Sequence, residues 1–240
     1  MTQYFPSPTN ALVTLVHQSP LFLLTMKAGE NRFNTNFVNA LLSALDSIEQ
    51  IRETEDGQPA ALITRGEGKF FSNGLDLEHA LSVPGFFDNY YLKLLVRMLT
   101  FPIPTVAALN GHAFAGGCMF ALAHDYRVMR SDRGYICMNE VDIPSPLHPG
   151  MAAIVRVKTV PKTYRNCVLQ GYRFNGQEAL DQQLVDVIAK GEEEVLIKAK
   201  ELGKKWSGKA KAGVIYGLLK REMYIEAINY MEVKGWNAKL

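Results

Sequence analysis

The sequence predicts an α/β domain, because short buried strands alternate with amphipathic helices along most of the chain. Apolar runs at residues 60–64, 105–109 and 126–129 have the length and composition of buried strands. Segments with helical periodicity separate them, and this alternation is typical of a sheet covered by helices. The 240 residues, 48% of them hydrophobic, suffice for one domain with a sizeable core.

The first 74 residues are expected to form a hairpin, a helix, a strand and a loop. Residues 11–16 and 21–26 are β-rich, and Ser19-Pro20 between them indicates a turn. The helix begins at a cap, Asn34 or Thr35. Its apolar positions, at helical spacing, are Phe37, Leu41, Leu45 and Ile48. The strand at 60–64 then leads into a loop over 65–74.

The second half of the chain begins with a helix over about 88–100, which Pro102 and Pro104 end. A further helix is expected from Gly116-Gly117, and helical pieces are expected over 150–182 and 191–234. Asn175 and Glu178 have the spacing of a capping box. Further strands are expected at 105–109, 126–129, 135–138 and 184–188. We expect a core over residues 1–190 and a helical C-terminal region over residues 191–240.

The charge and cysteine content exclude several classes of function. A formal net charge of +2 favours neither nucleic acid nor a membrane surface as the main partner. Apolar runs are far shorter than the roughly 20 residues that span a bilayer, so no membrane span is expected. Three cysteines without a Cys-x-x-Cys pair indicate a reducing compartment, with neither a disulfide framework nor a metal site.

Two glycine-bearing loops carry the chemistry that the sequence suggests. The first is Phe70-Phe71-Ser72-Asn73-Gly74-Leu75-Asp76-Leu77, and the second runs from Asn110 to Met119. Glycines at a helix start, here Gly116-Gly117, let a ligand approach free backbone N–H groups, which favour negative charge. The same glycines also suit tight packing of a strand on a helix. With one carboxylate, Glu140, downstream, the pair of loops suits proton abstraction beside a thioester carbonyl.

These motifs resemble those of the enoyl-CoA hydratase/isomerase (crotonase) superfamily. The family's Phe-Ser-x-Gly-x-Asp-Leu is matched by residues 71–77, and its Ala-x-x-Asn-Gly-x-Ala-x-x-Gly-Gly by residues 107–117. A later Glu-Ala-Leu-x-x-x-Leu-Val element appears at 178–185, with Gln183 where glycine is usual. The resemblance spans most of residues 10–190. It implies repeated ββα units, a helical C-terminal part used in trimer formation, and an acyl-CoA ligand.

The resemblance also implies the residues of the site. The thioester oxygen would be held by the backbone amides of Leu75 and Gly116. The CoA side of the groove would be lined by residues after the second strand, near Ala28, and by the first loop. The residues expected to bind substrate or CoA are Arg32, Phe33, Ser72, Asn73, Gly74, Asp76, Leu77 and Gly117. No cofactor is expected, since coenzyme A is part of the substrate.

The acids of the site distinguish branches of this superfamily. Hydratases carry two glutamates, one of them three residues beyond the oxyanion glycine; in this chain that position is Met119, which cannot transfer a proton. The other position is Glu140. Adding water needs a group that activates the water and helps to deliver its proton, whereas moving a double bond needs one base. The pattern resembles the Δ3,Δ2-enoyl-CoA isomerases of plant peroxisomes and their relatives, with Glu140 as the single acid/base.

Several alternatives stay open. One is an enoyl-CoA hydratase in which Asp142 or an ordered water supplies the missing acid, although Asp142 also suits a turn-capping role. Another is a non-catalytic member of the fold used in assembly or RNA binding. The lysines that suggest RNA, which are interspersed with glutamates, are Lys198, Lys200, Lys204, Lys205, Lys209 and Lys211. His112 is expected to make a structural hydrogen bond, and His124-Asp125 to cap a helix.

The partners expected are an acyl-CoA thioester and further copies of the chain, as a homotrimer or a dimer of trimers. The last residues, Ala238-Lys239-Leu240, resemble the Ser-Lys-Leu type of peroxisomal address. We therefore expect a peroxisomal import receptor as a partner and the peroxisome as the location.

Overall fold

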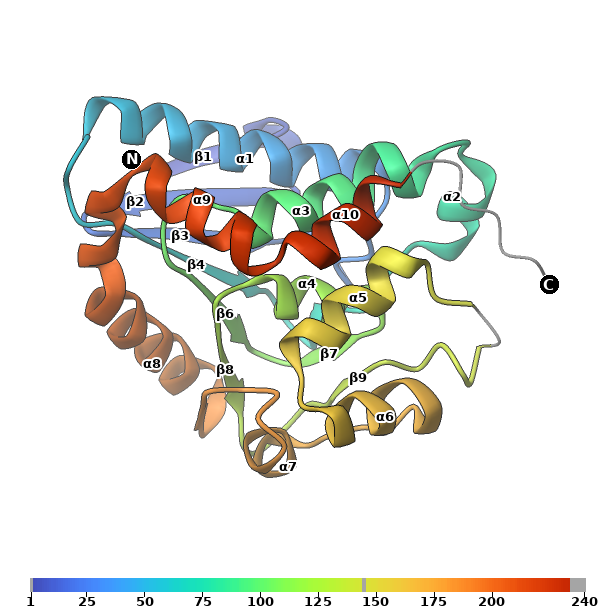
Figure 1. Ribbon diagram of the computed structural model, residues 1–240. Coiled ribbons are helices and arrows are strands. Elements are labelled where there is room, and N and C mark those ends of the chain that lie inside the picture. Colours follow the sequence, from blue (N-terminus) through green and yellow to red (C-terminus); the bar gives the residue numbers. More distant parts are fainter. Residues whose placement is uncertain (1, 144–145, 234–240) are drawn as a thin grey trace.

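A computed structural model describes residues 2–143 and 146–233, in which helices cover a mostly parallel sheet (Figure 1). Within these residues the larger sheet has seven strands in the order β1-β2-β3-β4-β6-β8-β10. The strands are β1 Thr2–Phe5, β2 Val13–Gln18, β3 Leu21–Met26, β4 Ala61–Gly66, β6 Thr105–Leu109, β8 Tyr126–Arg130 and β10 Val187–Ala189. The predicted α/β class is confirmed.

The first three strands are antiparallel, and the strands from β3 onwards are parallel. The predicted hairpin is confirmed as β2 and β3, while β1 was not predicted. Strands β4 and β6 are almost entirely buried, as expected for parallel strands with both faces covered. Their continuous apolar runs follow from that double burial.

The strand expected at 184–188 begins three residues later, as β10. The amides of Leu184 and Val185 instead donate to the carbonyl oxygen of Ala179, at 2.8 and 3.3 Å, and close the end of the preceding helix. Gln183, which stands where the resemblance expects glycine, has a φ of 58°. This is the left-handed region that glycine enters at least cost, so the departure in sequence retains the turn.

A second, smaller sheet has three parallel strands, each of which follows a strand of the larger sheet along the chain. Its strands are β5 Phe70–Ser72, β7 His112–Phe114 and β9 Ile136–Cys137, in that order within the described residues. Each of the two glycine loops leaves this sheet, one after β5 and the other after β7. The small sheet therefore brings the two loops side by side.

Helix α1, Thr35–Thr54, lies along the sheet and begins at Asn34, one of the two predicted caps. The Oδ1 atom of Asn34 accepts a hydrogen bond of 3.0 Å from the amide of Phe37. The predicted apolar stripe is confirmed, and its four residues are buried. Short segments precede and follow it: η1 Pro8–Asn10, α2 Leu77–Ser82, the π-helical turn η2 Phe87–Tyr91, and α3 Leu92–Leu99.

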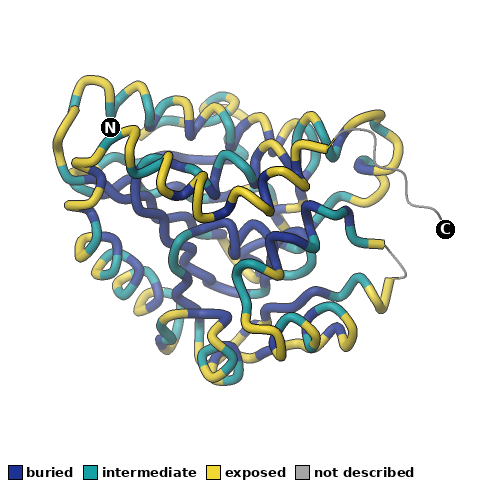
Figure 2. The backbone as a smooth tube through the Cα atoms, in the orientation of Figure 1, coloured by how far each residue is buried: buried dark blue, intermediate teal, exposed yellow. Residues whose placement is uncertain are grey.

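Helix α4, Gly116–Ala123, lies at the centre of the molecule, and each of its residues is buried (Figure 2). It contacts α3 and α5. The helical pieces predicted over 150–182 are α5 Pro149–Lys158, α6 Pro161–Gln170 and α7 Gly176–Asp181. Asn175 and Glu178 form the predicted capping box at the start of α7.

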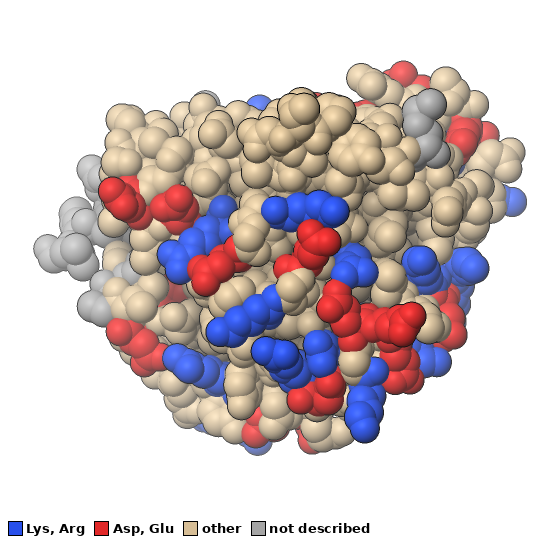
Figure 3. Space-filling model, turned by 180° about the vertical axis from the view of Figure 1, so that it is seen from behind, with Lys and Arg blue, Asp and Glu red and all other residues tan. Residues whose placement is uncertain are grey.

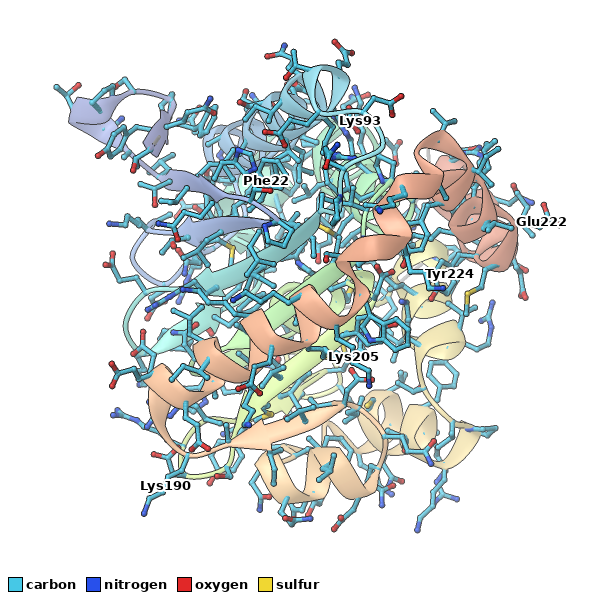
Figure 4. The ribbon with its side chains drawn as sticks, turned by 90° about the vertical axis from the view of Figure 1, so that its left-hand side faces the viewer. Phe22, Lys93, Lys190, Lys205, Glu222 and Tyr224 are labelled. Carbon is cyan, nitrogen blue, oxygen red and sulfur yellow. The ribbon has the colours of Figure 1, made fainter. Side chains whose placement is uncertain are left out.

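The C-terminal region consists of α8 Gly191–Trp206, η3 Ser207–Ala212, α9 Val214–Met223 and α10 Ile225–Glu232. Helix α8 crosses β4, β6 and β8, running from near Lys190 to near Lys205 (Figure 4). Its Val195 and Ala199 pack on Ile63 and Val106 in a second apolar cluster. Helix α10 instead packs on α5. None of the helices in the described residues is long and apolar enough to cross a bilayer.

Candidate active site

The first glycine loop is held to the segment after β3 by an isolated parallel bridge between Phe33 and Leu75. The amide of Phe33 donates to the carbonyl oxygen of Gly74 at 2.8 Å, and the amide of Asp76 donates to that of Phe33 at 3.0 Å. In such a bridge the N–H group of the middle residue, Leu75, points away from the partner segment. Gly74 permits this course because its φ is 81°.

Ser72 and Asn31 support this loop from inside the protein, and both are fully buried. The Ser72 hydroxyl donates to the backbone oxygen of Asn31 at 2.7 Å and accepts from the amide of Gly74 at 3.2 Å. The side-chain amide of Asn31 donates to the carbonyl oxygen of Phe71 at 3.0 Å. Asn31 was not among the predicted site residues. Its type gives a weak signal, because asparagine tolerates the positive φ of 53° found here.

The second loop enters α4 through Ala115, whose φ is 48°. The amide of Ala115 donates to Cys137 O at 2.9 Å, and its carbonyl oxygen accepts from the amide of Met119 at 3.0 Å. A positive φ is costly for a residue with a Cβ atom and persists only where the surroundings hold it. The two hydrogen bonds of Ala115 hold the turn in this conformation. The turn sets the direction of the next N–H group, that of Gly116.

The two loops approach each other as closely as their glycines allow. A Cβ atom on Gly74 would lie 2.9 Å from Phe114 O and 3.3 Å from Gly116 N. A Cβ atom on Gly117 would lie 2.3 Å from Ser72 O. The close packing expected of these glycines is therefore present, and it brings the segment of Leu75 against the start of α4.

No hydrogen bond within residues 2–143 and 146–233 uses the N–H group of Leu75 or that of Gly116. A buried, unused N–H group is costly unless a ligand or water accepts from it. Gly116 also opens a helix, where the dipole favours negative charge. Two such donors side by side are suited to hold an oxyanion.

Glu140 lies in the turn after β9, and its Oε2 atom is buried without a hydrogen-bond partner among the described residues. Burial raises the pKa of Glu140 to about 7. Burial raises the pKa of Tyr91 and of Cys118, and the charge of Glu140 raises both further. This effect indicates that the Glu140 carboxylate lies near the start of α4. A carboxyl group with this pKa is an effective base near neutral pH.

Two neighbouring positions decide whether Glu140 has an acidic partner. Met119 is buried and apolar, at 1% exposure. Asp142 is exposed and turns toward the end of α6, where a Cβ atom on Gly171 would lie 3.0 Å from its Oδ2 atom. The pKa of Glu140 is raised by burial, and no carboxylate of the described residues contributes. Neither Met119 nor Asp142 therefore places a second acid beside Glu140.

The other predicted residues lie around the first loop. Glu30 accepts from Arg32 Nε at 2.7 Å and from Asn73 Nδ2 at 2.9 Å. These two hydrogen bonds lower the pKa of Glu30. A cavity of about 430 Å³ beside them is lined by residues that include Ala28, Arg32 and Asp76. The structure thus brings this part of the predicted groove together.

The remaining predicted residues differ in exposure. Phe33 is fully buried against Phe37, Tyr91 and Phe120, so its side chain is part of the core. Leu77 is 43% exposed at the start of α2. Asp76 caps that helix by accepting from the amide of His79 at 3.3 Å. Of these residues, Leu77 offers the most surface to a ligand.

The histidines outside this site have structural contacts. His112 Nδ1 accepts from the amide of Tyr135 at 3.2 Å, which confirms its predicted hydrogen bond. His124 is the C-cap residue of α4, as predicted, and its amide donates to Ala121 O at 3.2 Å. Its buried ring bonds Phe120 O, in the last turn of α4, and Thr64 Oγ1, each at 2.9 Å. Burial lowers the pKa of His124 to about 3. Over the described part of the chain, no cluster of three His, Cys, Asp or Glu side chains could hold a metal ion.

Comparison with known proteins gives relatives over almost the whole chain. The sequence profile of the enoyl-CoA hydratase/isomerase family matches residues 18–228. Enoyl-CoA delta isomerase 3 of Arabidopsis thaliana is 35% identical over 94% of this chain and 98% of its own. The peroxisomal enoyl-CoA delta isomerase 2 of the same plant is 36% identical over 90% and 93%.

Among solved structures, a protein of Mycobacterium tuberculosis superposes with a TM-score of 0.81; it is named an enoyl-CoA isomerase in its apo form and a probable enoyl-CoA hydratase in a second structure. It is 26% identical, and the match covers 92% of this chain and 96% of the other. The fold expected from the resemblance is therefore confirmed. The chain belongs to the enoyl-CoA hydratase/isomerase family.

Proposed function

We propose that the protein is a Δ3,Δ2-enoyl-CoA isomerase that converts 3-enoyl-CoA to trans-2-enoyl-CoA in fatty acid β-oxidation. The observation that carries the proposal is the buried, unpaired Oε2 atom of Glu140, whose charge acts on Tyr91, the residue that donates to Gly116 O. The amides of Leu75 and Gly116 make no hydrogen bond among the described residues. The isomerase names of the Arabidopsis relatives support the same reaction. Acyl-CoA is the substrate, and no cofactor is needed for it.

In the proposed mechanism the thioester oxygen accepts hydrogen bonds from the amides of Leu75 and Gly116. The carboxylate of Glu140 takes a proton from C2, and the electron pair of that C–H bond passes into a dienolate whose oxyanion the two amides stabilise. Protonated Glu140 then returns the proton at C4. A double bond forms between C2 and C3 as that between C3 and C4 is lost. One well-aimed donor of this kind contributes about 3 kcal/mol to such a transition state.

The raised pKa of Glu140 suits both halves of this reaction. A base with a pKa of about 7 is about half ionised at neutral pH, and its ionised form accepts a proton readily. Once protonated, the carboxyl group gives the proton back without a large barrier. Burial is the cause of the raised pKa, so the packing around Glu140 sets the strength of the base.

Enoyl-CoA hydratase is the second candidate function, because the family contains both activities. A hydratase needs a second group to handle the proton of water. Met119 is a buried thioether at the position where hydratases carry a glutamate, and Asp142 is directed toward Gly171. Both observations favour the isomerase.

The test is product analysis with 3-hexenoyl-CoA and, separately, trans-2-hexenoyl-CoA. The expected result is 2-enoyl-CoA from the first substrate, little 3-hydroxyacyl-CoA from the second, and loss of isomerisation in Glu140→Gln. Asp142→Asn is the matched control and is expected to retain activity, because its carboxylate is exposed. Rapid hydration of trans-2-hexenoyl-CoA by the unaltered protein would establish the hydratase instead.

We also propose that the C-terminal region, residues 191–240, serves in self-association, as a trimer or a dimer of trimers. Helix α9 presents exposed apolar side chains that the described chain leaves uncovered: Val214, Ile215, Leu218, Leu219 and Met223. Exposed apolar patches of this kind mark interaction surfaces. Light scattering of the purified protein measures the assembly, and a monomeric mass would contradict it.

A peroxisomal location, reached through an import receptor, is proposed from two observations. The relative named enoyl-CoA delta isomerase 2 is peroxisomal, and the tripeptide Ala238-Lys239-Leu240 resembles a peroxisomal address. The tripeptide lies outside the described residues. Fluorescent fusion proteins with and without these three residues test the proposal, since only the fusion that carries them should enter peroxisomes.

RNA binding is less well supported. Lysines of α8 are accompanied by acids, and Lys198 pairs with Glu201 at 3.0 Å. On the face opposite that of Figure 1, basic and acidic side chains are interspersed rather than gathered by sign (Figure 3). A nucleic-acid site normally shows a continuous basic surface. Steeply salt-sensitive retention of RNA would reverse this judgement.

A further inference from the structure

Tyr91 is a fully buried tyrosine that touches the second loop, and it was not among the residues predicted for the site. It ends the π-helical turn η2 just before α3, and its ring packs against Phe33 with ring centroids 5.2 Å apart. Its hydroxyl donates a hydrogen bond of 2.6 Å to the carbonyl oxygen of Gly116. Turns of π-helix often occur at functional sites, where the extra residue redirects a side chain.

The Tyr91 hydroxyl lies where the two loops meet. A Cβ atom on Gly116 would lie 3.0 Å from the hydroxyl oxygen and 3.3 Å from the side chain of Leu75. Gly116 is therefore enclosed by Tyr91 and Leu75, and its carbonyl oxygen is fixed from the side of α3. The residue before it, Ala115, has a positive φ that its surroundings must maintain.

The hydroxyl is suited to remain a donor while Glu140 changes its charge. Burial raises the pKa of Tyr91 well above its ordinary value, and the nearby charge of Glu140 raises it further. The phenol thus stays protonated over the pH range of catalysis. A hydrogen bond from it to Gly116 O is present in both protonation states of the base.

We propose that Tyr91 is a positioning residue of the oxyanion site, whose hydroxyl fixes Gly116 so that its N–H group and that of Leu75 converge on the thioester oxygen. The inference rests on the proposed function, because it assigns a role within that site. An error of about 1 Å in such a site costs roughly 100-fold in rate. Loss of the hydroxyl therefore affects the charged transition state more than the binding of substrate.

The test compares Tyr91→Phe with Tyr90→Phe, which removes a hydroxyl from the preceding residue. For Tyr91→Phe we expect kcat on 3-hexenoyl-CoA to fall by about 10- to 100-fold with KM nearly unchanged. For Tyr90→Phe we expect both to stay within about twofold, since no hydrogen bond of its hydroxyl is found among the described residues. Equal kinetics for Tyr91→Phe and the unaltered protein would overturn the inference.

A spectroscopic readout distinguishes positioning from folding. The absorption of 2,4-hexadienoyl-CoA shifts to the red when donors polarise its carbonyl group. We expect the shift on the unaltered protein and on Tyr90→Phe, and a smaller shift on folded Tyr91→Phe. An undiminished shift would overturn the inference. A red shift on the unaltered protein without isomerisation would contradict the proposed function, and the role of Tyr91 would still be decided by comparing the shifts of the variants. No red shift on the unaltered protein would contradict both the proposed function and the role of Tyr91.

A second variant keeps the test decisive if Tyr91→Phe folds poorly. Gly116→Ala places its methyl group against the same hydroxyl, so it disturbs the same hydrogen bond. We expect Gly116→Ala to lower kcat and to reduce the red shift. Adding Tyr91→Phe to Gly116→Ala should lower kcat by a smaller factor than Tyr91→Phe does alone, because both changes act on one contact. Fully multiplicative effects would overturn the inference.

Discussion

Phe33 and Leu75 are joined by a single parallel bridge, and it directs the free amide of Leu75 away from Phe33. The side chain of Phe33 is meanwhile locked in an aromatic cluster with Phe37, Tyr91 and Phe120. The hydrophobic core therefore holds one of the two donors of the candidate site. The amide is placed by residues that do not themselves contact an oxyanion.

Gly74→Ala is expected to lower kcat by about 100- to 1,000-fold, the range for loss of one oxyanion donor. The new Cβ atom would lie 2.9 Å from Phe114 O and 3.3 Å from Gly116 N, so the loops must separate. Gly68→Ala is the matched control, because Gly68 also has a positive φ, 78°, but nothing within 4 Å of the new atom. Steady-state kinetics decide, and an equal loss in both variants would mean that backbone strain alone is responsible.

The pH profile of kcat/KM is expected to rise about tenfold per unit up to a pH of about 7 and then to level off. Burial raises the pKa of Glu140 to about 7, and the base must be ionised to take a proton. His112→Gln is the control, since the pKa of His112 is lowered and its titration lies elsewhere. A profile flat between pH 5 and 8 would exclude Glu140 as the base.

The same pKa predicts how Glu140 affects stability. Because the folded-state pKa is about 7 and the ordinary value is 4.5, the folded protein holds this proton more tightly than the unfolded chain. Stability is therefore lost as pH rises from about 4.5 to about 7. Glu140→Gln, which cannot ionise, should exceed the unaltered protein by about 1–3 kcal/mol at pH 8 and match it near pH 4.

Urea unfolding at the two pH values measures this difference in the free energy of unfolding. Asp142→Asn, at an exposed position two residues away, is the control; it keeps Glu140, so its stability should equal that of the unaltered protein at both pH values. A Glu140→Gln variant that is no more stable than the unaltered protein at pH 8 would show that the carboxylate is well solvated.

Lys220→Met is expected to destabilise the protein by about 3–5 kcal/mol. Lys220 lies on α9, pairs with Asp125 at 2.6 Å and donates to Ile103 O at 3.0 Å. Both partners of the ion pair are nearly buried, so removing the ammonium leaves a carboxylate in a poorly solvated place.

Arg221→Met is the control for this variant, because Arg221 pairs with Glu232 at 3.3 Å on the surface. A surface pair of this kind contributes at most about 1 kcal/mol. Thermal unfolding of both variants supplies the comparison, and equal melting temperatures would mean that the buried pair does not anchor α9.

The sequence by itself determined the elements whose signals are local. The apolar runs at 60–64 and 105–109, the cap at Asn34 and the capping box at Asn175 all lie where expected, because strand composition and capping depend on near neighbours. The order of the loop motifs also sufficed for the family. The strand expected at 184–188 was displaced because tertiary pairing with β8, rather than apolar character, fixes where β10 begins.

Only the tertiary structure decided how those elements make a site. The contact of the Tyr91 hydroxyl with Gly116, the support of Ser72 by Asn31, and the burial that raises the pKa of Glu140 join residues far apart in the chain. No local pattern encodes such contacts, since they arise when the small sheet of β5, β7 and β9 brings its loops together. The sequence thus determined which groups make up the candidate site, and packing determined their direction, solvation and proton affinity.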